Sequence, residues 1–229
     1  MKILGLMTLA CALSTGWFAP SLRAESAAER LHESALVLGD LMNAKDNNIP
    51  EDLLEGARCV IVIPDAKKAA FVVGGQYGRG FMTCRTRTGS WSAPGAVRME
   101  GGSIGWQIGG AESDIVMLVM NDEGERSLLE SKFTLGGNAS VAAGPIGRSA
   151  SARTDGKLTA GILTYSHSHG VFAGISVSGA TLRNDLDENK ELYGRKLTNR
   201  EVIAGGVAPT AAARPLLSEL SRYTREAKR

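Results

Sequence analysis

The centre of the chain reads Gly101-Gly-Ser-Ile-Gly-Trp-Gln-Ile-Gly-Gly110 and continues into Ser113-Asp-Ile-Val-Met-Leu-Val119. A second block of the same kind is Leu135-Gly-Gly-Asn-Ala-Ser-Val-Ala-Ala-Gly-Pro-Ile-Gly147. Both blocks place glycines and small residues between short β-branched runs, which are typical of strands. Glycines inside strands mark bulges, curvature or close approach of two backbones. The two blocks therefore predict a tightly packed, curved sheet and a function located on a surface.

Helical patterns flank this region on both sides. Apolar residues recur at spacings of three and four over 26–44, and shorter helical segments are expected at 51–57 and 126–131. Three C-terminal helices are expected near 184–193, 199–205 and 215–227. Strands do not alternate regularly with long helices, which argues against a doubly wound fold. The predicted fold class is α+β: a curved, mostly antiparallel, glycine-rich sheet or partial barrel, flanked by an N-terminal helix and C-terminal helices.

Several strands can be located by their composition. Pro64 is expected to close the first of them, and Gly74–Gly80 is expected to form a tight hairpin. A further hairpin turn is expected at Ser166–Gly170. The expected strands are 59–63, 69–73, 81–87, 115–120, 158–165 and 171–177.

The first 24 residues are predicted to be an export signal. Lys2 is the charged start, residues 3–13 form an apolar core, and Leu22-Arg-Ala24 resembles a cleavage site. The apolar run is shorter than the ~20 residues of a membrane-spanning helix. Lipidation at Cys11 is the alternative to cleavage after Ala24. We therefore expect a signal peptide, 1–24, and a single domain, 25–229, located in the periplasm or associated with the envelope.

The overall charge is balanced. The chain contains 26 lysines and arginines against 24 aspartates and glutamates, and removal of Lys2 and Arg23 with the signal would leave 24 of each. A domain that binds nucleic acid normally carries a clear basic excess. Nucleic acid is therefore not an expected partner.

The charges are nevertheless unevenly distributed. Residues 25–57 carry eight acidic and two basic residues, whereas residues 58–100 carry seven basic and two acidic ones. Such a local surplus can attract phosphate head groups, although a solvated strand face would have the same composition. Long cationic side chains reach phosphate while their stems cover apolar surface. The candidate lipid-binding residues are Lys67, Lys68, Arg79, Arg85 and Arg87.

Two cysteines, Cys59 and Cys84, occur in residues 25–229. They lie in strand-like runs on either side of an expected hairpin. In an exported protein they could form a structural disulfide. Sequence spacing alone leaves open whether they are bridged.

Motifs that would indicate catalysis or metal binding are incomplete. Gly101-Gly-Ser-Ile-Gly105 matches the Gly-x-Ser-x-Gly pattern, but the residues after it are poor helix formers and a nucleophile elbow needs a following helix. His167 and His169 could offer two metal nitrogens, but no Cys, Asp or Glu near them in sequence completes a site. We therefore expect neither an enzyme, nor a metal site, nor a cofactor.

Several ordered motifs between about Ala28 and Tyr223 resemble the SYLF domain family, a lipid-binding module also described as the actin-binding domain of a yeast actin-patch protein. The motifs are Lys67-Lys-Ala-Ala-Phe71, Gly78-Arg-Gly80, Trp91-Ser-Ala-Pro94, Gly105-Trp-Gln-Ile-Gly109, Ser113-Asp114, Thr134-Leu-Gly-Gly-Asn138, Ala143-Gly-Pro-Ile-Gly-Arg148, Tyr165-Ser-His-Ser-His-Gly-Val-Phe-Ala-Gly174 and Asn189–Gly194.

The resemblance implies a non-enzymatic domain that binds phospholipids and, in fungi, also actin filaments. Export would make actin an unlikely partner of this chain. Eukaryotic relatives are thought to engage membranes through a basic N-terminal helix, whereas the matching helix here carries Glu29, Glu33 and Asp40. Lipid binding is therefore expected on the basic region 58–100, or through the apolar face of the helix alone. The alternative function is an envelope structural or protein-interaction module whose basic face meets an acidic protein partner.

Overall fold

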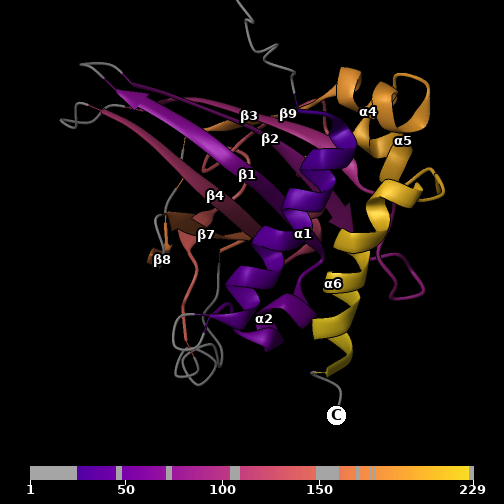
Figure 1. Ribbon diagram of the computed structural model, residues 1–229, viewed down its shortest axis with the longest axis horizontal. Coiled ribbons are helices and arrows are strands. Elements are labelled where there is room, and N and C mark those ends of the chain that lie inside the picture. Colours follow the sequence, from indigo (N-terminus) through magenta and orange to yellow (C-terminus); the bar gives the residue numbers. More distant parts are fainter. Residues whose placement is uncertain are drawn as a thin grey trace, which may run out of the picture.

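A computed structural model describes residues 25–44, 48–70, 74–103, 109–147, 160–168, 171–175, 177 and 179–226. A large curled sheet carries helices on one face and at one end (Figure 1). The helices are α1 Ala27–Asn43, α2 Glu51–Gly56, α3 Asp122–Leu128, α4 Leu186–Tyr193, α5 Asn199–Ile203 and α6 Arg214–Glu226, with a 3-10 turn at Ala211–Ala213. The strands are β1 Cys59–Ala70, β2 Gly74–Cys84, β3 Gly95–Ser103, β4 Gly109–Val119, β5 Lys132–Thr134, β6 Val141–Ala143, β7 Ile162–Ser168, β8 Val171–Gly174 and β9 Thr181–Asn184.

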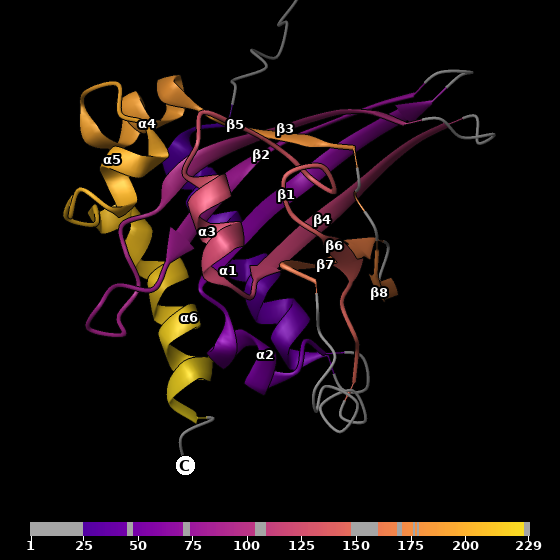
Figure 2. The same ribbon diagram turned by 180° about the vertical axis from the view of Figure 1, so that it is seen from behind.

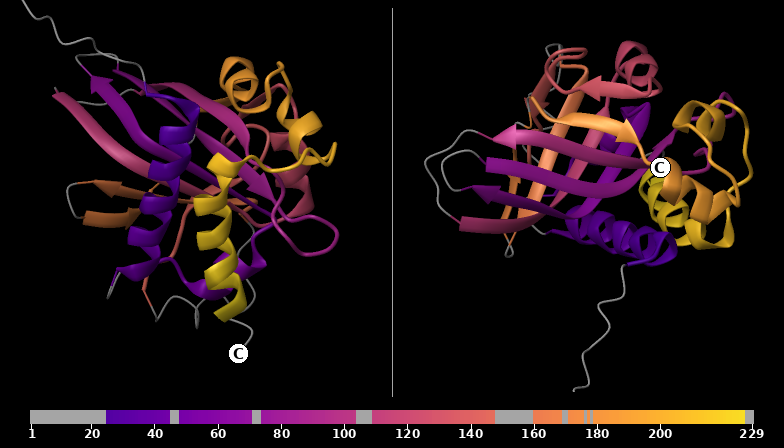
Figure 3. Two further views of the ribbon diagram at one scale, coloured as in Figure 1. Left: turned by 45° about the vertical axis from the view of Figure 1, so that its right-hand side comes forward. Right: turned by 90° about the horizontal axis from the view of Figure 1, so that it is seen from above.

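The strands form one sheet in the order β5-β9-β3-β2-β1-β4-β7-β6, with β8 also paired to β7. Of the strand pairs in the described residues, β6 with β7 is parallel and the others are antiparallel. Seen from above, β5, β9, β3, β2, β1 and β4 follow one another across the curled sheet (Figure 3). The predicted fold class, an α+β fold with a curved partial barrel, is confirmed.

The sheet has a hydrophobic core on each face. The face that we call outer packs against α1, α2 and α6, and its core includes Val62, Phe81, Ala96 and Val116. The inner face packs against α3 and the β5 region, which lie in front of the sheet in Figure 2. Both faces of the central strands are therefore covered over much of their length, which explains the near-continuous apolar runs in β1 and β4.

Helix α1 confirms the helix predicted over 26–44. Ser26 and Glu29 form a capping box at its start. Its stripe of Leu31, Leu38 and Leu41 is fully buried against the sheet and α6, and each such burial contributes about 1.5–3 kcal/mol. The protein's own core occupies this apolar stripe, so it is not exposed for insertion into a membrane.

The prediction that Pro64 closes a strand is wrong. β1 continues to Ala70, and its register shifts against both neighbouring strands around Pro64 and Asp65, which is a β-bulge. Proline lacks the N–H that a ladder needs, and a bulge is one of the places where a sheet tolerates it. The bulge also bends the strand and re-aims the side chains next to it.

The predicted hairpin at Gly74–Gly80 is also wrong, because this segment is the first part of β2. Its glycines allow β2 to pack closely against β1 and do not form a turn. A Cβ on Gly80 would lie 2.7 Å from the Ile63 Cα, and a Cβ on Gly78 would lie 2.5 Å from the Ile63 Cγ2. Such distances are shorter than real Cβ contacts, so these positions exclude a side chain.

The remaining helices are close to their predicted positions. α3 begins at Asp122, four residues earlier than predicted, because the Asn121 side chain caps its first turn. α4 begins at Leu186, where Asp185 is the cap, and the residues before it form β9. Among the described residues, no helix is both long and apolar enough to cross a membrane.

Cys59 and Cys84 are direct cross-strand neighbours on β1 and β2, and a disulfide joins them with an S–S distance of 2.06 Å. Both residues are fully buried in the inner-face core. The bond ties the start of β1 to the end of β2. The role of this disulfide is therefore structural.

Candidate functional site

The structure does not bring together the five cations that the sequence nominated. Lys67 and Lys68 are consecutive residues of β1 and so point to opposite faces of the sheet. Arg79 lies in the middle of β2, whereas Arg85 and Arg87 lie just after the last residue of that strand, Cys84. Lys67 and Arg79 share the outer face, while the other three residues lie elsewhere.

Arg85 supports the local structure of its loop. Its guanidinium stacks on the Trp91 ring at 3.9 Å from the ring centroid and donates to the Gly89 carbonyl at 3.0 Å. Burial lowers the pKa of Arg85, and the attraction of Glu55 opposes this effect. The side chain is thus already engaged with the turn between β2 and Trp91.

The register of the sheet places a different set of cations in one line. Arg79 on β2 lies opposite Arg98 on β3, Arg98 lies opposite Arg183 on β9, and Arg183 lies opposite Lys132 on β5. Directly opposite residues of antiparallel strands project from the same face. Arg79 is two residues from the buried Phe81, so this is the outer face, beyond the helices. We call Arg79, Arg98, Arg183 and Lys132 the cationic row.

Adjacent strands lie ~4.8 Å apart, so the cationic row spans roughly 14 Å. The side chains of Arg98 and Arg183 are 37% and 42% exposed, and Lys132 is exposed. Glu100 pairs with both arginines, at 2.6 Å from Arg98 and 3.4 Å from Arg183. Lys132 has no ion-pair partner among the described residues. Two of these three cations therefore share one carboxylate, and the third is unpaired among the described residues.

This arrangement is unfavourable for the sheet in isolation. Like charges directly opposite one another destabilise an antiparallel pair, by up to about 1 kcal/mol each. A single glutamate offsets part of that repulsion. A bound anion would offset the rest, so the row is suited to a surface that carries several negative charges.

Sequence reasoning missed most of this row. Arg98 is one of the seven basic residues in 58–100, but it is not among the predicted lipid-binding residues. Lys132 and Arg183 lie in distant parts of the chain. Their proximity depends on the pairing of β3 with β9 and of β9 with β5. β5 and β9 have three and four residues, which is too short for a clear strand signal in the sequence.

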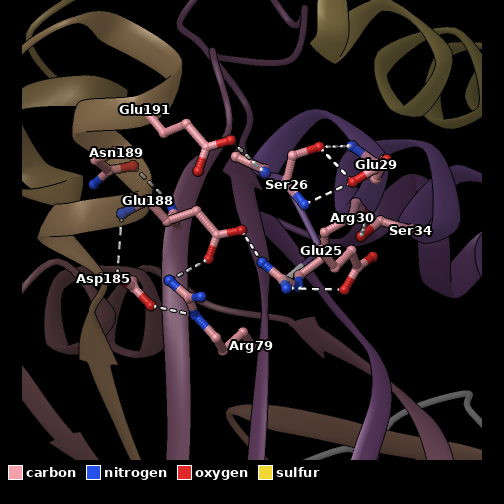
Figure 4. A network of polar contacts seen from close by, with 12 residues as sticks. Glu25, Ser26, Glu29, Arg30, Ser34, Arg79, Asp185, Glu188, Asn189 and Glu191 are labelled. Atoms are coloured by element: carbon pink, nitrogen blue, oxygen red, sulfur yellow. Dashed lines mark hydrogen bonds and ion pairs between the residues drawn. The ribbon is translucent and has the colours of Figure 1, made fainter. Parts of the chain in front are cut away.

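Arg79 ends the row and anchors it in a buried ion network (Figure 4). Its Nε lies 2.7 Å from Asp185 Oδ2, and its Nη2 lies 3.0 Å from Glu188 Oε2. Arg30 of α1 pairs with the other Glu188 oxygen and, at 2.8 Å, with Glu25. The network joins α1, β2 and the start of α4.

Glu188 depends on both arginines for its charge. Its side chain is 1% exposed, and burial raises the pKa of the carboxyl group, while the charges of Arg30 and Arg79 lower it. For Arg79, burial disfavours the charged form, but the hydrogen bond to Asp185 and the charge of Glu188 outweigh it and the pKa is raised. The two carboxylates therefore favour the charged form of Arg79, whereas the pKa of Glu188 is raised because burial outweighs the attraction of the two arginines.

A groove of about 310 Å³ lies on the outer face beside this network. The start of α1, the bulge of β1 and the middle of β2 enclose it. Its lining residues are Glu25, Arg30, Pro64, Asp65, Lys67, Tyr77, Gly78 and Arg79. The groove therefore opens next to the first residue of the cationic row.

The alternative sites considered from the sequence remain incomplete in the described residues. Ser103 is the last residue of β3, and the rest of this pattern, including Gly105, lies outside the described residues. His167 belongs to β7 instead of the predicted turn, with Nδ1 3.5 Å from Asp114 Oδ2, and His169 lies outside the described residues. The cluster of Cys59, Cys84 and Glu125 offers no thiolate, since both cysteines are in the disulfide.

Comparison with known proteins matches residues 100–223 to the Ysc84 family, described as "Las17-binding protein actin regulator". Protein YSC84 of Saccharomyces cerevisiae is 38% identical over 177 residues, which cover 75% of this chain and 37% of that protein. The "SH3 domain-containing YSC84-like protein 1" of Rattus norvegicus is 32% identical over 183 residues, covering 80% of this chain and 54% of that protein.

The matched region thus spans between about a third and a half of the length of these relatives. The description of the family concerns binding and regulation. The resemblance to the SYLF family seen in the sequence motifs is confirmed: the chain belongs to the Ysc84, or SYLF-domain, family.

Proposed function

We propose that the protein associates with membrane surfaces by binding anionic phospholipid head groups through its cationic row. The observation that carries this proposal is the register that aligns Arg79, Arg98, Arg183 and Lys132 on the outer face, where the last three are at least partly exposed. Each base held near an anionic membrane surface contributes about 1 kcal/mol. The three exposed members would together contribute about 3 kcal/mol, which suits a reversible, peripheral association.

We further propose that the domain is not an enzyme. The description of the matched family names binding and regulation. The buried polar network around Glu188 is built from ion pairs that connect three elements, which supports a structural role for it. A surface that binds its partner through electrostatic attraction needs no catalytic side chain.

Export is the third part of the proposal, with residues 1–24 as the signal. A buried disulfide supports it, because such bonds persist mainly in oxidising compartments. Intact mass measurement of protein isolated from its native host tests this directly. We expect a chain that starts at Glu25 and has both cysteines oxidised; a retained Met1 or two free thiols would contradict export.

Vesicle co-sedimentation tests the lipid proposal. We expect binding to vesicles that contain phosphatidylglycerol, no binding to purely zwitterionic phosphatidylcholine vesicles, and a steady loss of binding as salt rises from about 0.05 to 0.5 M. Absence of binding to the anionic vesicles at low salt would reject the proposal. The cationic row would then be better explained by an acidic protein partner.

Actin filaments are the relevant acidic protein to include, because the family description names actin regulation. If the protein works outside the cytosol, we expect no co-sedimentation with filaments under salt conditions that allow vesicle binding. Filament binding without vesicle binding would favour the protein-partner function.

A further inference from the structure

The groove beside the cationic row contains a carboxylate held in an unusual backbone conformation. Asp65 has φ +48°, and it is the single non-glycine residue with positive φ in the described residues. Its N–H donates to Asp114 Oδ1 at 3.1 Å, which holds the bulge in place. This conformation costs about 1–2 kcal/mol for a residue with a Cβ. Asp65 is exposed and lines the groove, and its carboxylate has no partner among the described residues.

Tyr77 forms the aromatic wall of the same groove. It is 46% exposed, and its hydroxyl has no hydrogen-bond partner among the described residues. An aromatic ring attracts a cation above its face, and a carboxylate beside the ring adds to the attraction. Asp65 and Tyr77 therefore offer two groups in one groove that attract a positive charge.

The groove also offers positive charge, because Lys67 lies directly opposite Tyr77 in the strand register and Arg79 lies two residues after Tyr77 on the same face. Lys67 pairs with Glu112 at 3.3 Å, but both side chains are more than 60% exposed, so this pair is weak and can be exchanged. Arg79 uses Nε and Nη2 for its two carboxylates, and Nη1 has no partner among the described residues (Figure 4). Lys67 and Arg79 therefore offer two groups in the same groove that attract an anion.

We propose that the groove binds a phospholipid head group of the phosphoethanolamine type, with a primary ammonium at Asp65 and Tyr77 and a phosphate at Lys67 and Arg79. A primary ammonium donates hydrogen bonds to the Asp65 carboxylate, whereas quaternary ammonium groups are recognised by cages of several rings. The volume lies at the lower end of the range for small-molecule pockets and suits a head group. This proposal rests on the membrane association proposed above, because the groove and the cationic row share Arg79.

A titration with soluble head groups tests the groove separately from the membrane. Backbone amide NMR shifts are followed while glycerophosphoethanolamine, glycerol phosphate or glycerophosphocholine is added to the protein. We expect saturable shifts at residues 64–67 and 77–79 with glycerophosphoethanolamine, and affinity at least about tenfold lower for the other two. Equal affinity for all three compounds, or no shift in the millimolar range, overturns the proposal.

The substitution Asp65→Asn is the informative variant. Asparagine tolerates positive φ, so the bulge and its N–H bond to Asp114 are retained. Loss of a hydrogen bond to a charged group predicts about tenfold weaker binding or more. The control Arg183→Gln/Lys132→Gln leaves the groove intact and is expected to bind the soluble head group as the wild type does. Unchanged affinity in Asp65→Asn contradicts the assignment.

Vesicles distinguish the two proposals. Two sets share one phosphatidylglycerol fraction, and the remaining lipid is phosphatidylcholine in one and phosphatidylethanolamine in the other. We expect tighter binding to the ethanolamine set for the wild type and no such preference for Asp65→Asn. Equal binding to both sets rejects the groove but leaves membrane association standing. Binding of soluble glycerophosphoethanolamine without binding to either vesicle set rejects membrane association instead.

Discussion

The outer face of the sheet has a covered part and an uncovered part, built from the same strands. On β2, Phe81 lies in the core formed with the helices and is 1% exposed, whereas Tyr77, four residues earlier on the same face, is 46% exposed. On β3, the buried Ala96 is followed two residues later by Arg98 of the cationic row. The change from buried core to exposed surface therefore takes four residues along β2 and two along β3.

This difference separates what stabilises the fold from what faces a partner. The covered part gains stability from apolar burial. The uncovered part places like charges opposite one another, which costs stability. The ion network of Arg30, Arg79, Asp185 and Glu188 lies at the boundary and closes the core on that side.

The covered part should respond most strongly to truncation. Phe81→Ala should lower the free energy of unfolding by about 3–5 kcal/mol, because it leaves a cavity beneath the helices. The matched change Tyr77→Ala removes an exposed ring of similar size from the same strand and face, and should alter stability by only about 0.5 kcal/mol. Urea denaturation of both variants measures the contrast. Similar losses would mean that the two parts are not distinct.

The boundary should be nearly as sensitive. Glu188→Ala leaves Arg30 and Arg79 each short of a carboxylate in a desolvated setting and should cost about 3–5 kcal/mol. The neighbouring change Asp187→Ala breaks an exposed pair with Lys196 and should cost far less. Chemical denaturation again provides the comparison. If Asp187→Ala were the more damaging, the network would not be the element that closes the core.

Sequence patterns predicted the covered part of the molecule well. The spacing of apolar residues in 26–44 and 215–227 identifies the helices of this layer, and the β-branched run of 59–63 identifies the core of β1. These signals are local, because periodicity depends only on residues a few positions apart. Pro64 and Gly74–Gly80 were misread because proline and glycine also serve bulges and close backbone contacts.

The uncovered part could not be predicted in the same way. The cationic row depends on the register of four strands, two of them very short, and the groove is lined in part by the bulge at Pro64 and Asp65. Register is set by long-range pairing and carries no signature within a short sequence window. The local basic surplus in 58–100 identified a charged region. The strand register places two of its basic residues, Arg79 and Arg98, in the cationic row.

The smallest effect on stability is expected in the cationic row itself. The variant Arg98→Gln/Arg183→Gln/Lys132→Gln removes the repulsion between neighbours and also the pairs with Glu100. We expect the free energy of unfolding to stay within about 1 kcal/mol of the wild type and to rise slightly. A loss well above that range would assign the row a structural role.

The most direct test of the central claim is the affinity of this triple variant for phosphatidylglycerol vesicles, set against a control that loses the same number of charges elsewhere. Lys68→Gln/Arg87→Gln/Lys190→Gln removes three exposed cations that lie outside the row. At about 1 kcal/mol per base, the row variant should bind roughly 100-fold more weakly than the wild type, and the control should bind within a few-fold of it. An equal or greater loss of affinity in the control would contradict the account.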